Sequence, residues 1–505
     1  MLKSLAINTG SNITLFVFNL VLTFLMSPIL VRNLGNHDYG VWELVIVAVG
    51  YMGILDLGIR PSVSRFTAYY RAKNDFDSLL DIFSTSLFYM FLLGLGSMLV
   101  FVYAGFHWAD QISEYQASSA RYKWLLIIIG IQVLIVFPGQ ITESILEGSH
   151  KFHVKNNVKM VISVIVSVVI YNLINSDNAL VLLAAVSTAG DAIKYVMFYV
   201  MLRLNRERPV YFTLTRVKWS VFREALSFGV KSFVSGASLT LQKTASTIII
   251  TAIVGVNKII YFSIPSRLMD FAWSLLGVLS QACMPLFAKL HGESKDELIR
   301  ETFFVLSKYI YAITVLLCIG ILVVGDDFLA IWMGQEYAIK GRIILTCTTT
   351  ASLFNAVNPL AGRYLTAINR HGVLAISQTV QTIVRVVFMI PLVHYLDYAG
   401  AAYASFISII FTFYILKQTC SCLETPVVDY LKIIVLPALL PALALFAYLA
   451  GVTEEYAVDS YTRLLLVSVT GGMIYTGFYY LASTNDKEKL FMRRMVKKIP
   501  DENRT

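Results

Sequence analysis

The chain contains few charged residues for its length, and this deficit excludes an ordinary soluble protein. Asp, Glu, Lys and Arg make up 14% of the 505 residues, whereas 57% of the residues are hydrophobic. Soluble globular domains usually contain about 25% charged residues. Together with a mean hydropathy of +0.68, the composition indicates a protein whose surface largely contacts lipid.

Cysteine is scarce as well, and the common nucleotide and metal motifs are missing. Of the five cysteines, Cys283, Cys318 and Cys347 fall in apolar segments, where a free thiol acts as a small apolar group. Cys420 and Cys422 are two residues apart, a spacing that matches no common zinc motif. The sequence has no Gly-x-x-x-x-Gly-Lys-Ser/Thr loop, and its histidines are scattered. We therefore expect no enzyme activity and no cofactor, with H⁺ or Na⁺ as the only coupled ions.

Long apolar segments occur along the whole chain and predict the fold class. A bilayer core of about 30 Å requires roughly 20 apolar residues in each spanning helix. We predict an all-α, polytopic membrane protein with about fourteen such helices. The predicted spans lie near residues 6–31, 39–60, 79–106, 124–147, 157–175, 178–202, 225–254, 259–288, 302–324, 343–367, 372–395, 398–417, 431–450 and 462–483.

Lys and Arg fall mainly in alternate loops, and this pattern predicts the orientation. With the N-terminus in the cytoplasm, 28 of the 41 cations lie on the inner side and seven on the outer side. Such a bias is what the positive-inside rule requires, so both termini are expected in the cytoplasm. The net charge of +9 then follows from topology and does not indicate a nucleic-acid partner.

Polar residues on the first and seventh helices indicate an internal duplication. Asn8, Asn12, Asn19 and Thr23 share one face of the first helix, and each has a polar counterpart 219 residues later. Because an even number of helices lies between the two starts, we expect parallel repeats. The predicted divisions are a six-helix lobe 1–202, a cytoplasmic amphipathic linker 203–224, a second six-helix lobe 225–417, an appended helix pair 418–483 and a basic cytoplasmic tail 484–505.

The linker and the tail both interleave basic with apolar residues. One interpretation is a solvated linker and a solvated tail. The other is a pair of interfacial helices that bind anionic membrane lipids.

Six cations fall inside predicted spans, where polar groups usually face the bundle interior. Two of them have an acidic neighbour three residues away on the same helix face, in the pairs Asp191–Lys194 and Arg267–Asp270. Either pair could be purely structural, and Lys308 and Arg385 could simply brace neighbouring helices or reach toward the interface. The six cations are Lys194, Lys231, Lys243, Arg267, Lys308 and Arg385.

Cations on consecutive helices favour an anionic substrate such as a pyrophosphate-linked lipid, because phosphate requires positive donors and Arg offers a planar fork. Carboxylates at depth could carry a coupled H⁺ or Na⁺. The candidate substrate-binding residues are Arg267, Lys231, Lys243, Asn12, Asn19 and Gln242. The candidate ion-coupling residues are Asp56, Asp270 and Glu43.

Three stretches resemble the polysaccharide flippases of the multidrug/oligosaccharidyl-lipid/polysaccharide exporter superfamily. They are the turn at 34–40 (Leu-Gly-Asn-His-Asp-Tyr-Gly), the helix end at 56–63 (Asp-Leu-Gly-Ile-Arg-Pro-Ser-Val) and the Tyr-rich entry at 261–268 (Tyr-Phe-Ser-Ile-Pro-Ser-Arg-Leu). The resemblance implies two lobes around a central cavity that opens alternately to either side.

The same resemblance implies the substrate and the partners. The expected activity is the export of an undecaprenyl-pyrophosphate-linked oligosaccharide, such as an O-antigen or capsule unit, across the cytoplasmic membrane of a prokaryote. The expected partners are this lipid-linked oligosaccharide, membrane lipids, and a polysaccharide polymerase with other export proteins.

Four alternatives remain open at this point. An ion-coupled drug antiporter or a lipid II flippase would share the fold, although Lys231 and Lys243 argue against a drug cavity. A membrane-embedded glycan polymerase or ligase would normally require a large outer loop with catalytic residues, and 325–342 is a poor candidate. A non-transporting assembly factor is the fourth.

Overall fold

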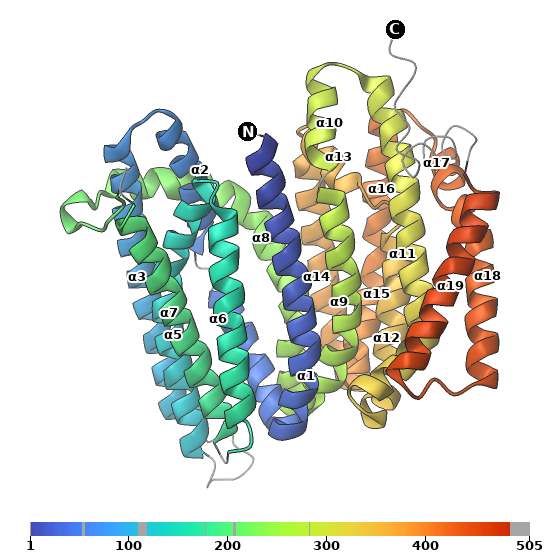
Figure 1. The fold of residues 1–505 in the computed structure, drawn as a ribbon, viewed down its shortest axis with the longest axis horizontal. Helices are drawn as coiled ribbons and strands as arrows, with labels where there is room; N and C mark the ends of the chain where they lie inside the picture. The colour runs from blue at the N-terminus through green and yellow to red at the C-terminus, as the bar shows by residue number, and fades with distance from the viewer. Residues whose placement is uncertain are drawn as a thin grey trace. The chain divides into compact units, whose positions relative to one another are not determined.

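The computed structural model describes residues 2–52, 56–109, 119–176, 178–205, 209–281 and 283–484, and within these ranges the regular structure is helical (Figure 1). The chain divides into two compact units, Met1–Ile260 and Tyr261–Thr505. The predicted all-α, polytopic fold is confirmed. Ten helices in the described residues are long and apolar enough to cross a membrane.

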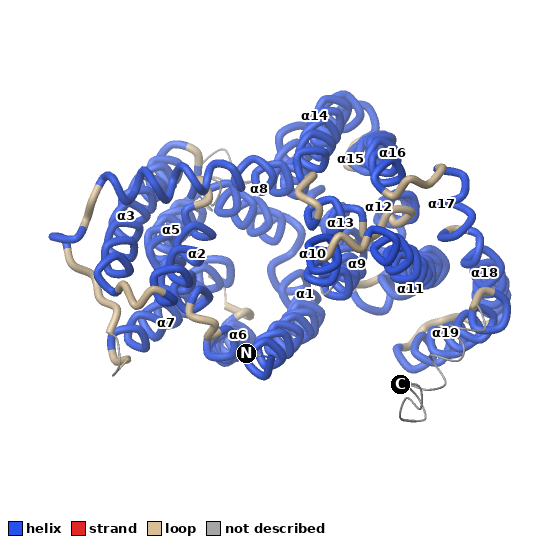
Figure 2. Tube along the Cα trace, turned by 90° about the horizontal axis from the view of Figure 1, so that it is seen from above, coloured by secondary structure: helices blue, strands red, loops and turns tan. Residues whose placement is uncertain are grey.

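The first unit contains most of the charged sites discussed below. In Figure 2 its helices are seen nearly end-on, with α3 and α7 both packed against α5. Its elements are α1 (Leu2–Met52), α2 (Ile59–Ala72), α3 (Phe76–His107), α5 (Ser119–Gly148), α6 (Phe152–Leu173), α7 (Ala179–Arg203), η3 (Leu214–Arg216), α8 (Trp219–Val254) and η4 (Val256–Lys258).

The second unit is built mainly from shorter helices. Its core gathers aromatic side chains, among them Phe287, Phe303, Tyr364 and Tyr430. Its elements are α9 (Ile259–Gln281), α10 (Cys283–Gly292), α11 (Asp296–Trp332), α12 (Gln335–Asn355), α13 (Ala361–Ala367), α14 (His371–Leu396), α15 (Ala399–Ile407), η5 (Ser408–Phe411), α16 (Thr412–Cys422), α17 (Val427–Ile434), α18 (Leu436–Glu455) and α19 (Tyr461–Ala482).

One predicted span ends earlier than expected. The sequence predicts a helix over 39–60, but α1 ends at Met52 and α2 begins at Ile59. Gly58 has a left-handed backbone with φ 79°, and the Asp56 carboxylate accepts hydrogen bonds from the Gly58 N–H at 2.8 Å and the Arg60 Nε at 2.5 Å. These bonds fix a turn at the start of α2, because they compensate for the helical hydrogen bonds lost there.

The backbone repeats with the offset of the predicted duplication. α3 begins at Phe76 and α11 at Asp296, 220 residues later, and α6 and α14 begin 219 residues apart. Positive φ angles recur in the same way, at Gly35 and Gly255, at Asn74 and Ser294, and at His150 and Asn369. A repeated sequence of helix lengths and turn geometries is what a duplicated unit produces. The superposition of the two halves stays a prediction.

The compact units divide after Ile260, later in the chain than the predicted linker 203–224. The reason lies in α8, which was assigned to the second lobe but contacts α1, α2 and α3. A Cβ on Gly229 would lie only 2.6 Å from the Leu57 carbonyl oxygen, so α2 and α8 approach each other through glycine. The division into two six-helix lobes stays a prediction.

The described part of the linker is held against α3. Arg216 pairs with Asp77 at 2.7 Å, and Lys218 pairs with Asp81 at 2.5 Å. The hydrogen bond to Asp77 raises the pKa of Arg216 further, so this cation is permanently charged. Only Leu214–Arg216 form a helical turn before α8 begins at Trp219. The described linker is therefore a strap on α3, and the predicted interfacial helix is not seen there. The tail from 485 onward lies outside the described residues.

Candidate functional site

A cavity of about 440 Å³ lies between α2 and α8 in the first unit. It exists because the two helices are close at Gly58 and Gly229 and then diverge. The Ser62 hydroxyl holds the close end by donating to the Ala225 carbonyl at 2.8 Å. The cavity is lined by Arg65, Phe66, Tyr69 and Tyr70 of α2 and by Glu224, Ser227 and Phe228 of α8.

Arg65 is the exposed cation of this cavity, which we call the α2–α8 cavity. Its guanidinium carbon lies 4.3 Å from the Phe228 ring centroid and 5.4 Å from that of Phe66. Within the described residues, no carboxylate forms a salt bridge with Arg65. Stacking on a ring leaves the in-plane N–H donors of a guanidinium available for a planar or tetrahedral oxyanion. The arrangement is suited to holding a phosphate group.

Neighbouring side chains add donors of a neutral kind. Burial and the charge of Glu224 raise the pKa of Tyr70, so its hydroxyl stays protonated at neutral pH. Ser227, which begins the predicted polar stripe of the seventh helix, also lines the cavity. Hydroxyl groups bind phosphate oxygens without adding charge.

A buried ionic cluster connects α5 and α6 in the same unit. Glu143 accepts a hydrogen bond from Lys159 and lies 3.6 Å from the Lys155 ammonium, and Lys155 also pairs with Glu147 at 2.7 Å. The side chains of Lys155 and Glu143 are only 9% and 14% exposed. Such pairs remain charged because each partner offsets the desolvation of the other.

The cluster extends to α7. Asp191 pairs with Lys194, as the sequence predicted, and accepts a hydrogen bond from the Gln132 side chain of α5 at 2.8 Å. The Lys194 charge also acts on Glu143. The cluster Glu143, Glu147, Lys155, Lys159, Asp191 and Lys194 thus carries three anions and three cations. It is balanced rather than cationic.

The sequence missed two members of this cluster. Lys155 and Lys159 were assigned to an inner loop, but both lie in α6. Their spacing of four residues matches that of Glu143 and Glu147 at the end of α5, across a tight turn. Two such i, i+4 pairs on adjoining antiparallel helices could have predicted a cross-helix ladder.

The polar stripe of the first helix faces α6 at its start. Asn12 accepts a hydrogen bond from the Asn156 amide at 2.7 Å, and the Asn8 amide donates to the His150 carbonyl at 3.0 Å. Asn19 is exposed. Asn12 therefore has a structural partner within the unit, and its predicted role in substrate binding stays a prediction, like that of Asn19.

The other predicted site residues of the first unit have different surroundings. Asp56 and Glu43 are both buried, at 7% and 9% exposure, and Asp56 has its carboxylate in the α2 turn. Gln242 is half-buried on α8, while the side chains of Lys231 and Lys243 lie outside the described residues. The predicted cationic group is therefore untested, and ion coupling by Asp56 or Glu43 stays a prediction.

In the second unit, Arg267 is half-buried and Asp270 is exposed on α9. The charge of Asp270 also acts on Arg385 of α14, a cation that the sequence left without a partner. Asp270 is thus shared between helices, and the predicted pair is part of a larger charged group. Another in-span cation, Lys308, has a bracing role, because it donates to the Ser483 carbonyl at the end of α19 at 2.6 Å.

Comparison with known proteins places these features in context. A family model described as "Polysaccharide biosynthesis protein" matches residues 5–291. A curated relative, the putative O-antigen transporter of Shigella flexneri, is 22% identical over 406 residues, covering 78% of this chain and 93% of the relative.

Two solved structures have a similar fold. An inward-facing multidrug resistance transporter of the MATE family and MOP superfamily aligns with a TM-score of 0.67 at 15% identity, covering 80% of this chain and 96% of the other. The lipid II flippase MurJ, in an inward closed conformation, aligns with a TM-score of 0.64 at 15% identity, covering 95% of this chain and 99% of the other.

Proposed function

The chain belongs to the polysaccharide biosynthesis protein family, and from this we propose that it flips an undecaprenyl-pyrophosphate-linked oligosaccharide from the inner to the outer leaflet of the cytoplasmic membrane. The sequence resemblance to polysaccharide flippases is thereby confirmed at the level of the family, and the chain is a membrane transporter of the MOP superfamily. The glycan unit, of O-antigen or capsule type, belongs to the proposal.

The observation that carries the proposal is the position of Arg65. Its guanidinium is exposed in a cavity and held by Phe228 at 4.3 Å, so it is positioned before any substrate arrives. A pyrophosphate offers several anionic oxygens, and Arg binds such groups through two parallel N–H donors. A drug cavity would have no need for a stacked, carboxylate-free Arg among aromatic and hydroxyl groups.

Further parts of the proposal follow the sequence predictions. Arg267, Lys231 and Lys243 bind the pyrophosphate later in the transport cycle, and a coupled H⁺ or Na⁺ exchanges at Asp56, Asp270 or Glu43. Both termini lie in the cytoplasm, and a polysaccharide polymerase with other export proteins receives the product.

Reconstituted flipping tests the proposed function directly. The full chain, in proteoliposomes with an inner-leaflet lipid-linked oligosaccharide, is expected to expose the glycan to an external lectin within minutes, whereas empty liposomes remain unreactive. Lipid II and a cationic dye serve as competing substrates in the same vesicles. Transport of the dye without exposure of the glycan would contradict the proposal and support a drug antiporter, and a preference for lipid II would support that relative's function.

Arg267 provides a second, independent test in the other unit. If Arg267 binds pyrophosphate, Arg267→Ala should reduce glycan exposure about tenfold or more at normal membrane abundance, because a charge-assisted hydrogen bond is lost. Arg267→Lys should recover part of the activity, since a point charge lacks the planar fork.

A structural role of Arg267 makes the opposite prediction. Asp270 acts on Arg385 as well, so the removal of Arg267 alone would unbalance this charged group and lower abundance. The double variant Arg267→Ala/Asp270→Ala would then recover abundance. Normal flipping by a well-expressed Arg267→Ala protein would remove Arg267 from the proposed site.

A further inference from the structure

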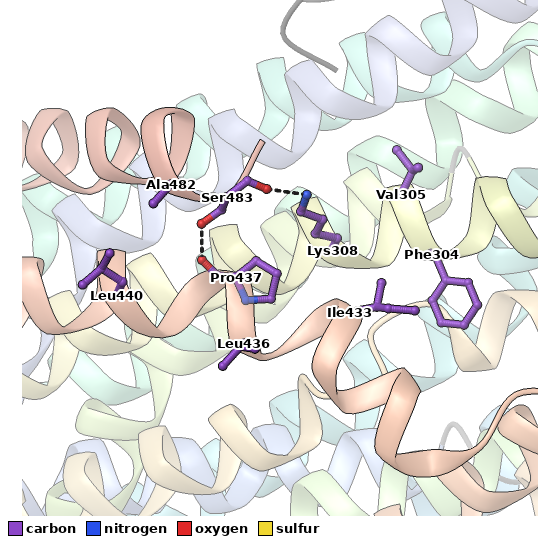
Figure 3. A pocket seen from close by; sticks show the side chains of 9 residues that line it. All are labelled: Phe304, Val305, Lys308, Ile433, Leu436, Pro437, Leu440, Ala482 and Ser483. Carbon is purple, nitrogen blue, oxygen red and sulfur yellow. Dashed lines mark hydrogen bonds between the residues drawn. The ribbon is translucent and has the colours of Figure 1, made fainter. Parts of the chain in front are cut away.

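A second pocket, of about 490 Å³, lies in the second unit between α11, the junction of α17 and α18, and the end of α19. Figure 3 shows the side chains around it. Most of them are apolar, including Phe304, Ile433, Leu436 and Leu440, and Lys308 provides the cation. The pocket belongs to the helix pair beyond the duplicated helices and shares no residue with the α2–α8 cavity.

Lys308 is held rigidly in this pocket. The residue is 7% exposed, and its ammonium donates to the Ser483 carbonyl at 2.6 Å, while the Ser483 hydroxyl donates to the Pro437 carbonyl at 2.5 Å. Both bonds are drawn in Figure 3. A cation fixed among apolar side chains attracts an anion more strongly than a cation in water, because the local dielectric constant is low.

The helix lengths place Lys308 near the inner surface of the bilayer. From Tyr309 to Trp332, α11 rises about 36 Å at about 1.5 Å per residue, which is enough to cross the hydrocarbon core. The 22 residues of α19 end beside Lys308 after a similar rise. With the inner side defined by the positive-inside rule, the ammonium lies at the level of lipid phosphates in the cytoplasmic leaflet.

The apolar wall of the pocket faces outward. Leu436 and Leu440 are 60% and 53% exposed, and Ile433 is 41% exposed. In a membrane these side chains contact acyl chains, so the pocket combines a phosphate-level cation with a surface for a lipid tail. A free phosphate ion would leave this surface unused.

The charge of the adjoining chain indicates which lipid is bound. Residues 485–505 follow Ser483 almost directly and contain seven Lys and Arg against four Asp and Glu. A basic segment next to the inner surface concentrates anionic lipids there. We propose that the pocket of Lys308, Leu436 and Leu440 binds an anionic phospholipid of the cytoplasmic leaflet, with its phosphate on Lys308 and a tail along α18.

Lipid binding to the full chain tests this proposal. In phosphatidylcholine nanodiscs with increasing phosphatidylglycerol, native mass spectrometry should show one retained phosphatidylglycerol per chain. Lys308→Gln keeps a donor for Ser483 but removes the charge, and it should weaken this binding about tenfold, as expected for the loss of a charge-assisted contact. Leu440→Trp should weaken binding as well, because the larger ring fills the pocket without changing any charge.

Lys289→Gln is the matched control, since Lys289 is an exposed lysine of the same unit, on α10, with a 73% exposed side chain. It removes the same charge and should retain the lipid. Equal retention by the native chain, Lys308→Gln and Leu440→Trp would overturn the proposal. Undecaprenyl pyrophosphate that displaces phosphatidylglycerol at equal concentration would also overturn it, because the pocket would then belong to the transport substrate. If Lys308→Gln does not fold, Leu440→Trp alone decides the outcome.

Discussion

Arg65→Ala is expected to reduce the flipping of a lipid-linked oligosaccharide roughly a hundredfold, because two charge-assisted hydrogen bonds to the pyrophosphate are lost. The protein should remain folded, since Arg65 is exposed and contacts the rings of Phe66 and Phe228 rather than a buried carboxylate. The initial rate of glycan exposure in proteoliposomes, normalised to the amount of reconstituted protein, measures the effect.

Three further variants define the cause of this loss. Arg65→Lys should retain a minor part of the rate, because a lysine supplies the charge without the fork. Phe228→Ala should lower the rate less than Arg65→Ala, since the guanidinium remains but loses its position. Lys73→Ala is the control, because Lys73 also stacks on a tyrosine, at 4.4 Å from the Tyr69 ring centroid, but does not line the cavity. Equal losses in Lys73→Ala and Arg65→Ala would indicate a general effect of surface charge.

Glu143→Gln is expected to destabilise the protein by about 3–5 kcal/mol, because it leaves buried lysines without their shared anion. The Glu143 side chain is 14% exposed and those of its partners Lys155 and Lys159 are 9% and 28% exposed, so solvent screens the pairs only weakly. The thermal unfolding of the purified protein, followed by fluorescence-detected size exclusion, should show a much lower midpoint and reduced membrane abundance.

An exposed pair provides the matched control for this measurement. Asp459 and Arg463 also form an ion pair, at 2.9 Å, but their side chains are 64% and 58% exposed. Asp459→Asn should change stability by no more than about 1 kcal/mol. The double variant Glu143→Gln/Lys159→Met should recover much of the loss, because it removes the unpaired charge. If Glu143→Gln were as stable as Asp459→Asn, the cluster would have no structural role.

The fold could be predicted from the sequence to a large extent. Each of the predicted spans is helical in the structure, with the largest error at 39–60, where α1 ends at Met52. That error has a local cause, since the Asp56 side chain and the left-handed Gly58 create a turn that apolar content alone does not reveal. The duplication was also visible in the sequence, and the backbone repeats at Gly35 and Gly255 with the same offset.

The candidate site was predicted less well. Of the two pairs read along one helix, Asp191–Lys194 forms a salt bridge, whereas Asp270 also acts on Arg385 of another helix. The cation of the α2–α8 cavity was counted only as an inner-loop charge. No spacing along α2 shows that Arg65 faces Phe228, because these residues are 163 positions apart.

The sequence by itself determined the membrane class, the succession of helices, the charge bias between loops and the repeat, because each depends on local composition or on a fixed offset along the chain. The tertiary structure decided which charges meet. Glu143 pairs with lysines of α6, Arg65 stacks on Phe228 of α8, and Lys308 holds the end of α19. Such contacts depend on the rotation and packing of helices about their axes, which the close approach of glycines such as Gly58 and Gly229 sets in three dimensions.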